Sequence, residues 1–468
     1  MSAVAPVRID AQRRLGILLK IGAICLLVGL LLIPLGMIGG LLADRQSFQK
    51  EAVESISSVW GHQQLICGPV LAVPYAYKHT VVRDKYVDGH LTQVDVVELV
   101  DATAYFLPDS LTITGKVTPE IRQRGIYDAV VYNTRLELAG DLNPDFAAAG
   151  IEAERIDWDK ARVYLGVSDL RGIRSVGVFK VAGQKEATFN SSDGVPGAFL
   201  PLAAKLDGVK PSTAFPFTLE VIVQGSKRLD FAPVGKTTSI TLQSPWPTPS
   251  FVGASLPFER SLDAAGFRAN WQSSHLSHGF PQNWTNRTAT NQDIANKISD
   301  ASFGVRFTTP VDGYGMVERA RKYGVLFFVL IFAVFFVFEI VAGLRIHPLQ
   351  YALVGAALCL FFIGFLALSE FWTTGWAYAV AAVACTVLVS LYSWNFLRAR
   401  DRTLVIAGGL SATYGYLYFV LQSQDYALLA GTLALFAVLA LVMFCTRRID
   451  WYALDPGTHA TPEPPKLS

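Results

Sequence analysis

Six long apolar segments constrain this chain more than any other feature of its sequence. One lies near the N-terminus, where residues 21–43 carry no charged side chain, and the other five follow one another from residue 323 to residue 446. Crossing about 30 Å of hydrocarbon takes about 20 apolar residues in a helix, which each segment supplies. The sequence therefore predicts an integral membrane protein. Its first apolar segment exceeds the about 7–15 residues of a signal-peptide core, so we expect an uncleaved anchor.

The six apolar segments and the polar stretch between the first two predict an α+β membrane protein with six transmembrane helices, one N-terminal and five C-terminal. The C-terminal spans are expected at 323–344, 351–369, 375–394, 403–421 and 426–446. The whole chain then divides into a cytoplasmic N-terminus at 1–20, helix one at 21–43, a large β-rich domain at 44–322, a five-helix bundle at 323–446, and a disordered cytoplasmic tail at 447–468. The β-rich domain is long enough to form two lobes.

The distribution of Lys and Arg sets the expected orientation, because cytoplasmic loops of membrane proteins are enriched in these residues. Basic residues flank the ends assigned to the cytoplasm, namely Arg8, Arg13, Arg14, Lys20, Arg345, Arg398, Arg400, Arg402, Arg447 and Arg448. The short loops at Glu370 and Asp425 contain none. One basic cluster, Arg319 to Lys322, disagrees, but long translocated domains largely escape this rule. We expect a multi-pass inner-membrane protein with both termini in the cytoplasm and residues 44–322 in the periplasm.

The residues between the first two spans show helical and then strand-like periodicity. Apolar residues recur every four positions across 44–60, which predicts a helix continuing out of the first span. Alternating patterns at 111–113, 136–138, 163–167, 217–223 and 240–242 then predict strands of two antiparallel sheets, and Asp88-Gly89 is a hairpin turn signal between strands at 78–87 and 90–100. Short helices are expected at 118–124 and 144–155. Cys67 has no cysteine partner in this domain, so its fold must rest on a packed core.

An acidic residue inside an apolar segment is the main candidate for intramembrane function. Glu339 lies within the second span, six residues before Arg345. A carboxylate at the bilayer centre costs roughly 2.5–3.5 kcal/mol on insertion scales, so such residues are functional candidates. The offset places Glu339 and Arg345 on different helix faces, and a partner is expected from another span. A structural contact between helices is the favoured interpretation, and a proton or ion role is the alternative.

Few polar motifs in the external domain point to chemistry. Ser168, Asp169 and Arg171 follow a predicted strand, and we interpret them as a surface turn in which Asp169 caps backbone amides. His275 and His278 have a spacing compatible with a shared metal, but no Cys, Asp or Glu lies between them. We therefore expect no catalytic residue, no metal and no cofactor. The net charge of +2 also argues against a nucleic-acid partner.

Several motifs spread over the chain resemble those of the CreD-type inner-membrane proteins of Gram-negative bacteria. The resemblance is carried by Ser58-Val-Trp60-Gly-His-Gln63, Gly68-Pro-Val-Leu-Ala-Val-Pro-Tyr75, Gly125-Ile-Tyr-Asp128, Gly166-Val-Ser-Asp-Leu-Arg-Gly172, Ser244-Pro-Trp-Pro-Thr-Pro-Ser-Phe251, Gly266-Phe-Arg-Ala-Asn-Trp271, Phe338-Glu339, His347-Pro-Leu-Gln350 and Thr446-Arg-Arg-Ile-Asp450. Only the first dozen residues and the polar tail lie outside it.

What this resemblance implies is a role in cell-envelope integrity, within the regulon of the CreBC two-component system. The family is associated with colicin tolerance and, in some bacteria, with β-lactam responses. It has no established catalytic residues. We therefore expect a non-enzymatic envelope protein whose partners are the inner membrane and other envelope or signalling proteins. A transporter or channel through the C-terminal bundle is one alternative, and a periplasmic enzyme acting on the cell wall is another.

Accessibility labelling tests the expected topology. A cysteine placed near Asp207 should react with a membrane-impermeant thiol reagent in intact spheroplasts, because that position is expected outside the inner membrane. A cysteine near Arg400 should react only after lysis. The chain without an added cysteine gives the background from its own thiols, and the reverse labelling pattern would overturn both the orientation and the periplasmic assignment.

Overall fold

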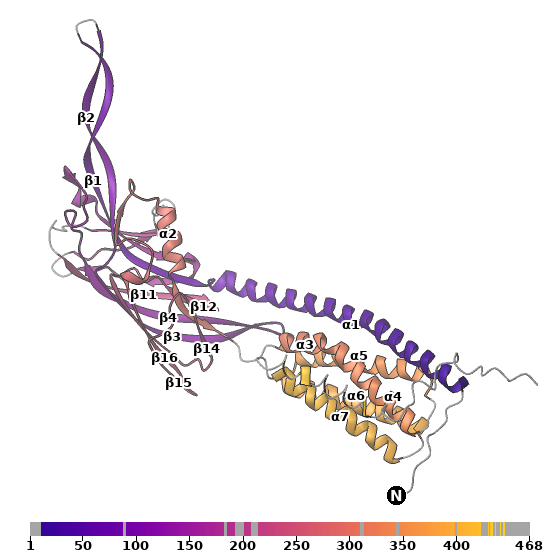
Figure 1. The fold of residues 1–468 in the computed structure, drawn as a ribbon. Coiled ribbons are helices and arrows are strands. Elements are labelled where there is room, and N and C mark those ends of the chain that lie inside the picture. The colour runs from indigo at the N-terminus through magenta and orange to yellow at the C-terminus, as the bar shows by residue number, and fades with distance from the viewer. Residues whose placement is uncertain are drawn as a thin grey trace, which may run out of the picture. The chain divides into compact units, whose positions relative to one another are not determined.

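The computed structural model describes most of residues 11–422 and a few positions between 429 and 444, with gaps at 88–89, 182–184, 192–200, 207–213, 309–312, 343–345 and 398–399. The chain forms two compact units. The first contains Met1–Phe48 and Val311–Ser468, and the second contains Gln49–Pro310. The element order is shown in Figure 1.

The first unit is helical. Helix α1 runs from Ala11 to Trp60, and its last turns belong to the second unit; α3 (Gly313–Lys322), α4 (Gly324–Ala342), α5 (Pro348–Ser369), α6 (Thr374–Leu397) and α7 (Arg400–Gln422) follow. The start of α5 is well defined by its sequence. Pro348 occupies the first helical turn, His347 Nδ1 accepts from the Leu349 amide at 3.2 Å, and the Gln350 side chain accepts from the His347 amide at 2.9 Å. Together these two side chains accept hydrogen bonds from two amides at the start of the helix, which have no carbonyl acceptor in a preceding turn.

Four helices in the described part of the chain are long and apolar enough to cross a membrane. They are α1, α5, α6 and α7, and they overlap four of the expected spans. The span expected at 323–344 coincides with the apolar helix α4. The span expected at 426–446 falls largely outside the described residues, and the tail at 447–468 and residues 1–10 of the N-terminus fall wholly outside them. The count of six therefore stays a prediction.

Two sheets make up most of the second unit. In the described residues the larger sheet has ten strands, β1 (Gln64–Val87), β2 (His90–Phe106), β5 (Arg155–Ile156), β6 (Arg162–Val167), β9 (Asn190–Ser191), β10 (Leu202–Lys205), β12 (Arg228–Phe231), β14 (Pro249–Gly253), β17 (Asn283–Thr285) and β18 (Phe303–Phe307). The other has eight, β3 (Ser110–Arg124), β4 (Tyr127–Leu142), β7 (Ile173–Val176), β8 (Lys180–Val181), β11 (Phe215–Ser226), β13 (Thr237–Ser244), β15 (Glu259–Asp263) and β16 (Gly266–Ser274). The short elements are α2 (Asn291–Asp300), η1 (Trp158–Lys160), η2 (Leu170–Gly172) and η3 (His275–Ser277).

In the described residues of the second unit, the two sheets share one apolar core. It joins Val70 of β1, Leu111 of β3, Val221 of β11 and Phe303 of β18, all of which are buried. Strands β3 and β11 alternate buried and exposed positions along much of their length, as expected for strands with one face on a core. The alternation that predicted these strands is thus the consequence of burying one face of each.

Strands β1 and β2 extend beyond this core as a two-stranded ribbon. They pair antiparallel from Leu71↔Phe106 to Val87↔His90, while β6 stops pairing with β1 at Ala72. Figure 1 shows the ribbon running out of the second unit as a twisted hairpin. The predicted hairpin is therefore confirmed, and its turn at Asp88-Gly89 lies outside the described residues.

Three expectations about the second unit are wrong. Residues 118–124 are the end of β3 and pair with β4, from Thr118↔Asn133 to Arg124↔Tyr127. Residues 144–155 contain a turn at 146–150, with Gly150 at a φ of 67°, and reach β5 at Arg155. The sheets are also not antiparallel throughout, because β1–β12 and β3–β13 are parallel pairs. At 118–124 and in the two parallel pairs, pairing with another strand decides the local structure, which periodicity along one segment does not register.

Trp271 offers a test of this core. It is fully buried in β16 and lies between the rings of Phe251 and Phe303. Trp271→Ala should lower the free energy of unfolding of the second unit by about 3–5 kcal/mol, because it removes a large apolar side chain and leaves a cavity. The matched control is Leu276→Ala nearby, where the side chain is 85% exposed and the change should be near zero. Equal effects of the two substitutions on thermal unfolding would contradict the core described here.

Candidate functional site

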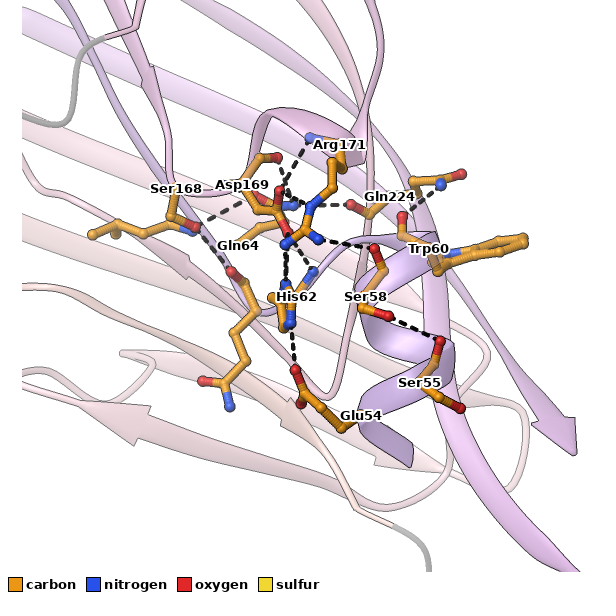
Figure 2. A network of polar contacts seen from close by, with 12 residues as sticks. Glu54, Ser55, Ser58, Trp60, His62, Gln64, Ser168, Asp169, Arg171 and Gln224 are labelled. Carbon is orange, nitrogen blue, oxygen red and sulfur yellow. Dashed lines mark hydrogen bonds and ion pairs between the residues drawn. The ribbon is translucent and has the colours of Figure 1, made fainter. Parts of the chain in front are cut away.

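A polar network surrounds the C-terminal end of α1, at the point where the chain turns into β1 (Figure 2). We call it the clasp, and define it by the side chains Glu54, His62, Gln64, Asp169, Arg171 and Gln224. Glu54 lies on α1, His62 and Gln64 lie at the start of β1, Asp169 and Arg171 belong to the turn between β6 and β7, and Gln224 is on β11. The clasp therefore joins the α1–β1 connection to two segments that are far from it in sequence, the β6–β7 turn and β11.

Two glycines allow the backbones to meet there. Gly61 ends α1 with a φ of 124°, and its amide donates to the Ser57 carbonyl at 2.8 Å. A Cβ at Gly61 would lie 3.0 Å from the Gln224 carbonyl oxygen, and one at Gly172 would lie 2.2 Å from the same atom. Only glycine fits both the left-handed helix end and this close approach.

Arg171 and Gln224 bind the exposed carbonyl groups at the end of α1. Arg171 Nη1 donates to the Ser58 carbonyl at 3.0 Å, and Gln224 Nε2 donates to the Trp60 carbonyl at 2.5 Å. These carbonyls have no later helical turn to donate to them, and the helix dipole favours a cation at this end. The guanidinium and the amide thus satisfy the helix end while attaching it to the β-sheet unit.

Asp169 holds the guanidinium in place. Its Oδ1 accepts from Arg171 Nε and its Oδ2 from Arg171 Nη2, both at 3.0 Å, in the two-point geometry that guanidinium and carboxylate favour. Asp169 also accepts from the amides of Arg171 at 3.1 Å and His62 at 3.0 Å. The interpretation of Asp169 as a turn cap agrees with these contacts.

These contacts change the acidity of Asp169. Burial acts to raise the pKa of its carboxyl, but the hydrogen bonds from Arg171 and His62 outweigh burial and hold the pKa well below its ordinary value of 3.8. A carboxyl with a lowered pKa stabilises the fold above its ordinary pKa and loses that contribution as the pH falls through the folded value. Asp169 is therefore ionised throughout the neutral range and anchors Arg171 there.

Gln64 fills the interior of the clasp. It is buried, and its Nε2 donates to the carbonyls of Asp169 at 3.1 Å and Gln224 at 3.2 Å, while its Oε1 accepts from the Asp169 amide at 3.2 Å. A buried amide with partners at both ends keeps neighbouring strands in register. Gln64 thus ties the β6–β7 turn to β11 from the inside.

Ser168 does not form a nucleophile pair with the neighbouring histidine. Its hydroxyl donates to the Gln63 carbonyl at 2.9 Å and accepts from the Leu65 amide at 3.0 Å, so it bonds to the backbone on either side of Gln64. Its bonds in the described residues include none to His62. An activated serine needs a base within hydrogen-bond reach, and this hydroxyl is instead a backbone anchor.

His62 and Trp60 complete the surroundings. His62 Nε2 lies 2.7 Å from Glu54 Oε1, and its Nδ1 lies 2.7 Å from Asp169 Oδ2. The Trp60 indole donates to the Tyr132 carbonyl at 3.3 Å, and the Arg122 guanidinium lies 4.9 Å from its ring centre. Such cation–π contacts contribute about 0.5–1 kcal/mol at exposed sites.

The second candidate site lies in the helical unit. Glu339 is buried, its Oε2 accepts from the Tyr351 hydroxyl at 2.9 Å, and its Oε1 accepts from the Ile346 amide at 3.1 Å. Lys20 of α1 forms an ion pair with Glu339 Oε1 and also donates to the Ile346 carbonyl at 2.6 Å. The carboxylate therefore has partners from α1 and α5 on both oxygens. Arg345, the other intramembrane candidate, lies outside the described residues.

Sequence reasoning found part of each site. The sequence predicts a polar turn at Ser168, Asp169 and Arg171, but its pattern does not show that His62, Gln64 and Gln224 contact that turn. The available signal was the motif Trp60-Gly-His-Gln63, which carried the family resemblance without showing what it contacts. In the sequence, Lys20 contributes only to the predicted membrane orientation, and its pairing with Glu339 is not predicted. In the part of the chain that the structure describes, His275 and His278 belong to no group of three or more His, Cys, Asp or Glu side chains.

Two comparisons with known proteins point to the same family over most of the chain. The family model described as "Inner membrane protein CreD" matches residues 16–452. The Inner membrane protein CreD of Escherichia coli (strain K12) is 32% identical over 430 residues, which cover 91% of this chain and 92% of that protein. Among solved structures, an M1 zinc metallopeptidase from Deinococcus radiodurans shares 9% identity over 36% of this chain and 38% of that one, with a TM-score of 0.19. A likeness that weak carries no information on fold or chemistry.

The clasp predicts a large effect for a small change at Asp169. Asp169→Asn keeps the shape but removes the charge that holds Arg171, and it should lower the free energy of unfolding by about 1–3 kcal/mol. Asp157→Asn is the matched control, because Asp157 also accepts from two cations, Arg155 at 2.9 Å and Lys160 at 3.0 Å, but its carboxyl caps no backbone amide at the start of η1. The control should have a much smaller effect on stability. Equal thermal shifts for both variants would show that the clasp is an ordinary surface ion pair.

Proposed function

Since this chain belongs to the CreD family of inner membrane proteins, we propose that it maintains cell-envelope integrity without turning over a substrate. In this proposal it crosses the inner membrane six times, keeps both termini in the cytoplasm, and exposes Gln49–Pro310 to the periplasm. It acts in an envelope stress response governed by a two-component system. Its partners are other envelope or signalling proteins, which the β-rich unit meets on the periplasmic side.

One observation carries the non-enzymatic part of the proposal. Among the described residues, the side chains of the clasp that could do acid–base chemistry together are bound to the end of α1 and to the turn beside it. Asp169 accepts from two amides and a guanidinium, and Ser168 bonds to the backbone of Gln63. Groups arranged this way resist movement of the helix end, and the Ser168 hydroxyl is not free to act as a nucleophile. They support a structural role for the clasp.

The surroundings of Glu339 favour a packing role over transport. A transported proton or ion needs a carboxylate that can exchange partners along a path. Both oxygens of Glu339 already have partners, Lys20, Tyr351 and the Ile346 amide. A buried carboxylate with this many partners links α1, α4 and α5. The transporter alternative would require these bonds to break during a cycle, whereas the structural role needs them to persist.

Substitutions at Glu339 distinguish these roles. Glu339→Gln keeps the shape and most of the hydrogen-bonding capacity while removing the charge, so it should leave detergent and colicin tolerance close to that of the unmodified protein. Glu339→Leu should lower the steady-state level of the protein, because it removes the carboxylate that pairs with Lys20 and leaves the Tyr351 hydroxyl and the Ile346 amide without their acceptor. Immunoblotting of membranes measures the level, and survival in detergent or colicin measures the function.

The control for these variants is Glu370→Gln. Glu370 also lies at the end of an apolar helix and pairs with Arg45, at 3.5 Å, but Arg45 is 41% exposed. Glu370→Gln should therefore have little effect on the steady-state level of the protein or on tolerance of detergent and colicin. If Glu339→Gln is made in normal amounts and yet behaves like a deletion, the charge at this position is essential, and the transporter alternative is then better supported than the packing role.

A further inference from the structure

His62 occupies a position in which its protonation state decides which bonds the clasp can make. Its Nδ1 lies 2.7 Å from Asp169 Oδ2 and also 2.7 Å from Arg171 Nη2, and its Nε2 lies 2.7 Å from Glu54 Oε1. A nitrogen that carries a proton can donate to the carboxylate but cannot accept from the guanidinium. A nitrogen without one accepts from the guanidinium but faces the carboxylate with a lone pair.

The imidazolium satisfies both carboxylates. With both ring nitrogens protonated, His62 donates to Glu54 on α1 and to Asp169 on the turn, which makes a continuous bridge between them. Arg171 loses its bond to the ring but keeps Asp169 Oδ1 at 3.0 Å and the Ser58 carbonyl at 3.0 Å. The helix end is then held by Arg171 and by His62 together.

A neutral ring donates to only one of the two carboxylates. With the proton on Nε2, the bond to Glu54 remains and Nδ1 accepts from Arg171, but the lone pair of Nδ1 then faces Asp169 Oδ2 at 2.7 Å. With the proton on Nδ1, the bond to Asp169 remains and Glu54, whose side chain is 62% exposed, faces a bare nitrogen and can turn to solvent. One of the two carboxylates therefore lacks a donor from the ring whenever His62 is neutral.

We propose that His62 is a pH-sensitive link in the clasp, which grips the end of α1 more tightly when the solution around the external unit becomes acidic. This inference rests on the structural role proposed above for the clasp. The charged groups that face the site are Glu54 of α1, Asp169 and Arg171 of the β6–β7 turn, and Lys227, which acts on Glu54 from the β11–β12 turn.

The electrostatic direction agrees with this geometry. Hydrogen bonds to Asp169 and then to Glu54 raise the pKa of His62 above its ordinary value of 6.5, against burial and the nearby Arg171. A raised pKa means that the stabilisation is complete below about 6.5 and is lost as the pH rises through the higher folded value. His62 is 36% exposed, so protons from solvent reach it and its contribution is moderate.

Amide hydrogen exchange of the full-length protein in detergent tests the link. Exchange of residues 54–64 is measured at pH 5.5 and pH 8.0 and corrected for the intrinsic pH dependence of the chemistry. Opening of the helix end should be about three- to tenfold more frequent at the higher pH. His62→Gln, which still hydrogen-bonds but does not titrate, should remove the difference. His275→Gln, at a histidine that contacts the Lys236 carbonyl instead, should retain it.

The outcomes separate the link from the structural role beneath it. No pH difference in the unmodified protein, or the same difference in His62→Gln, overturns the proposal. If His62→Gln does not fold, Glu54→Gln replaces it, since this exposed substitution removes one of the two carboxylates and should shrink the difference; an undiminished difference also overturns the proposal. If Asp169→Asn leaves exchange unchanged at pH 5.5, the clasp itself fails as the support of the helix end.

Discussion

The carbonyl groups at the end of α1 set the requirement around which the nearby β-structure is arranged. A helix that stops leaves its last carbonyls without donors, and a helix that enters a β-sheet unit must find those donors in the sheet. Arg171 and Gln224 supply them to Ser58 and Trp60. Because these donors come from the β6–β7 turn and from β11, satisfying the helix end also positions both segments. Gly61 and Gly172 are needed because the backbones must approach closely enough for this exchange.

A single charged side chain, Asp169, connects several of the segments around the helix end. Asp169 is shielded from solvent and binds Arg171 and the His62 amide, so its ionised form is favoured and its position is fixed. Other ion pairs of the same unit, such as Lys78–Glu154 and Arg135–Glu220, have both partners exposed and contribute little to stability. Glu339 plays the corresponding role in the helical unit, where it ties α1 to α5 through Lys20 and Tyr351. Each unit thus contains a carboxylate, Asp169 or Glu339, that takes part in linking α1 to its neighbours.

Local pattern in the sequence predicted the elements well and their contacts poorly. Apolar length located the helices, and alternation located β3, β4, β6, β11 and β13, because both features follow from burial of one surface. The same reasoning failed at 118–124, where pairing with β4 decides the structure. It also missed the clasp, since His62 is 107 residues from Asp169, and it missed Lys20, which is 319 residues from Glu339. Contacts at such separations leave no periodic trace in a single sequence.

The most direct test of this account is a double-mutant cycle between Asp169 and Arg171, measured as thermal unfolding of the full-length protein in detergent. If the carboxylate acts by holding the guanidinium against the helix end, Asp169→Asn and Arg171→Gln remove the same connection. The combined loss should then fall short of the sum of the single losses by more than about 1 kcal/mol. Additive losses would contradict the account, because they would mean that Asp169 and Arg171 stabilise the protein independently and that no clasp joins them.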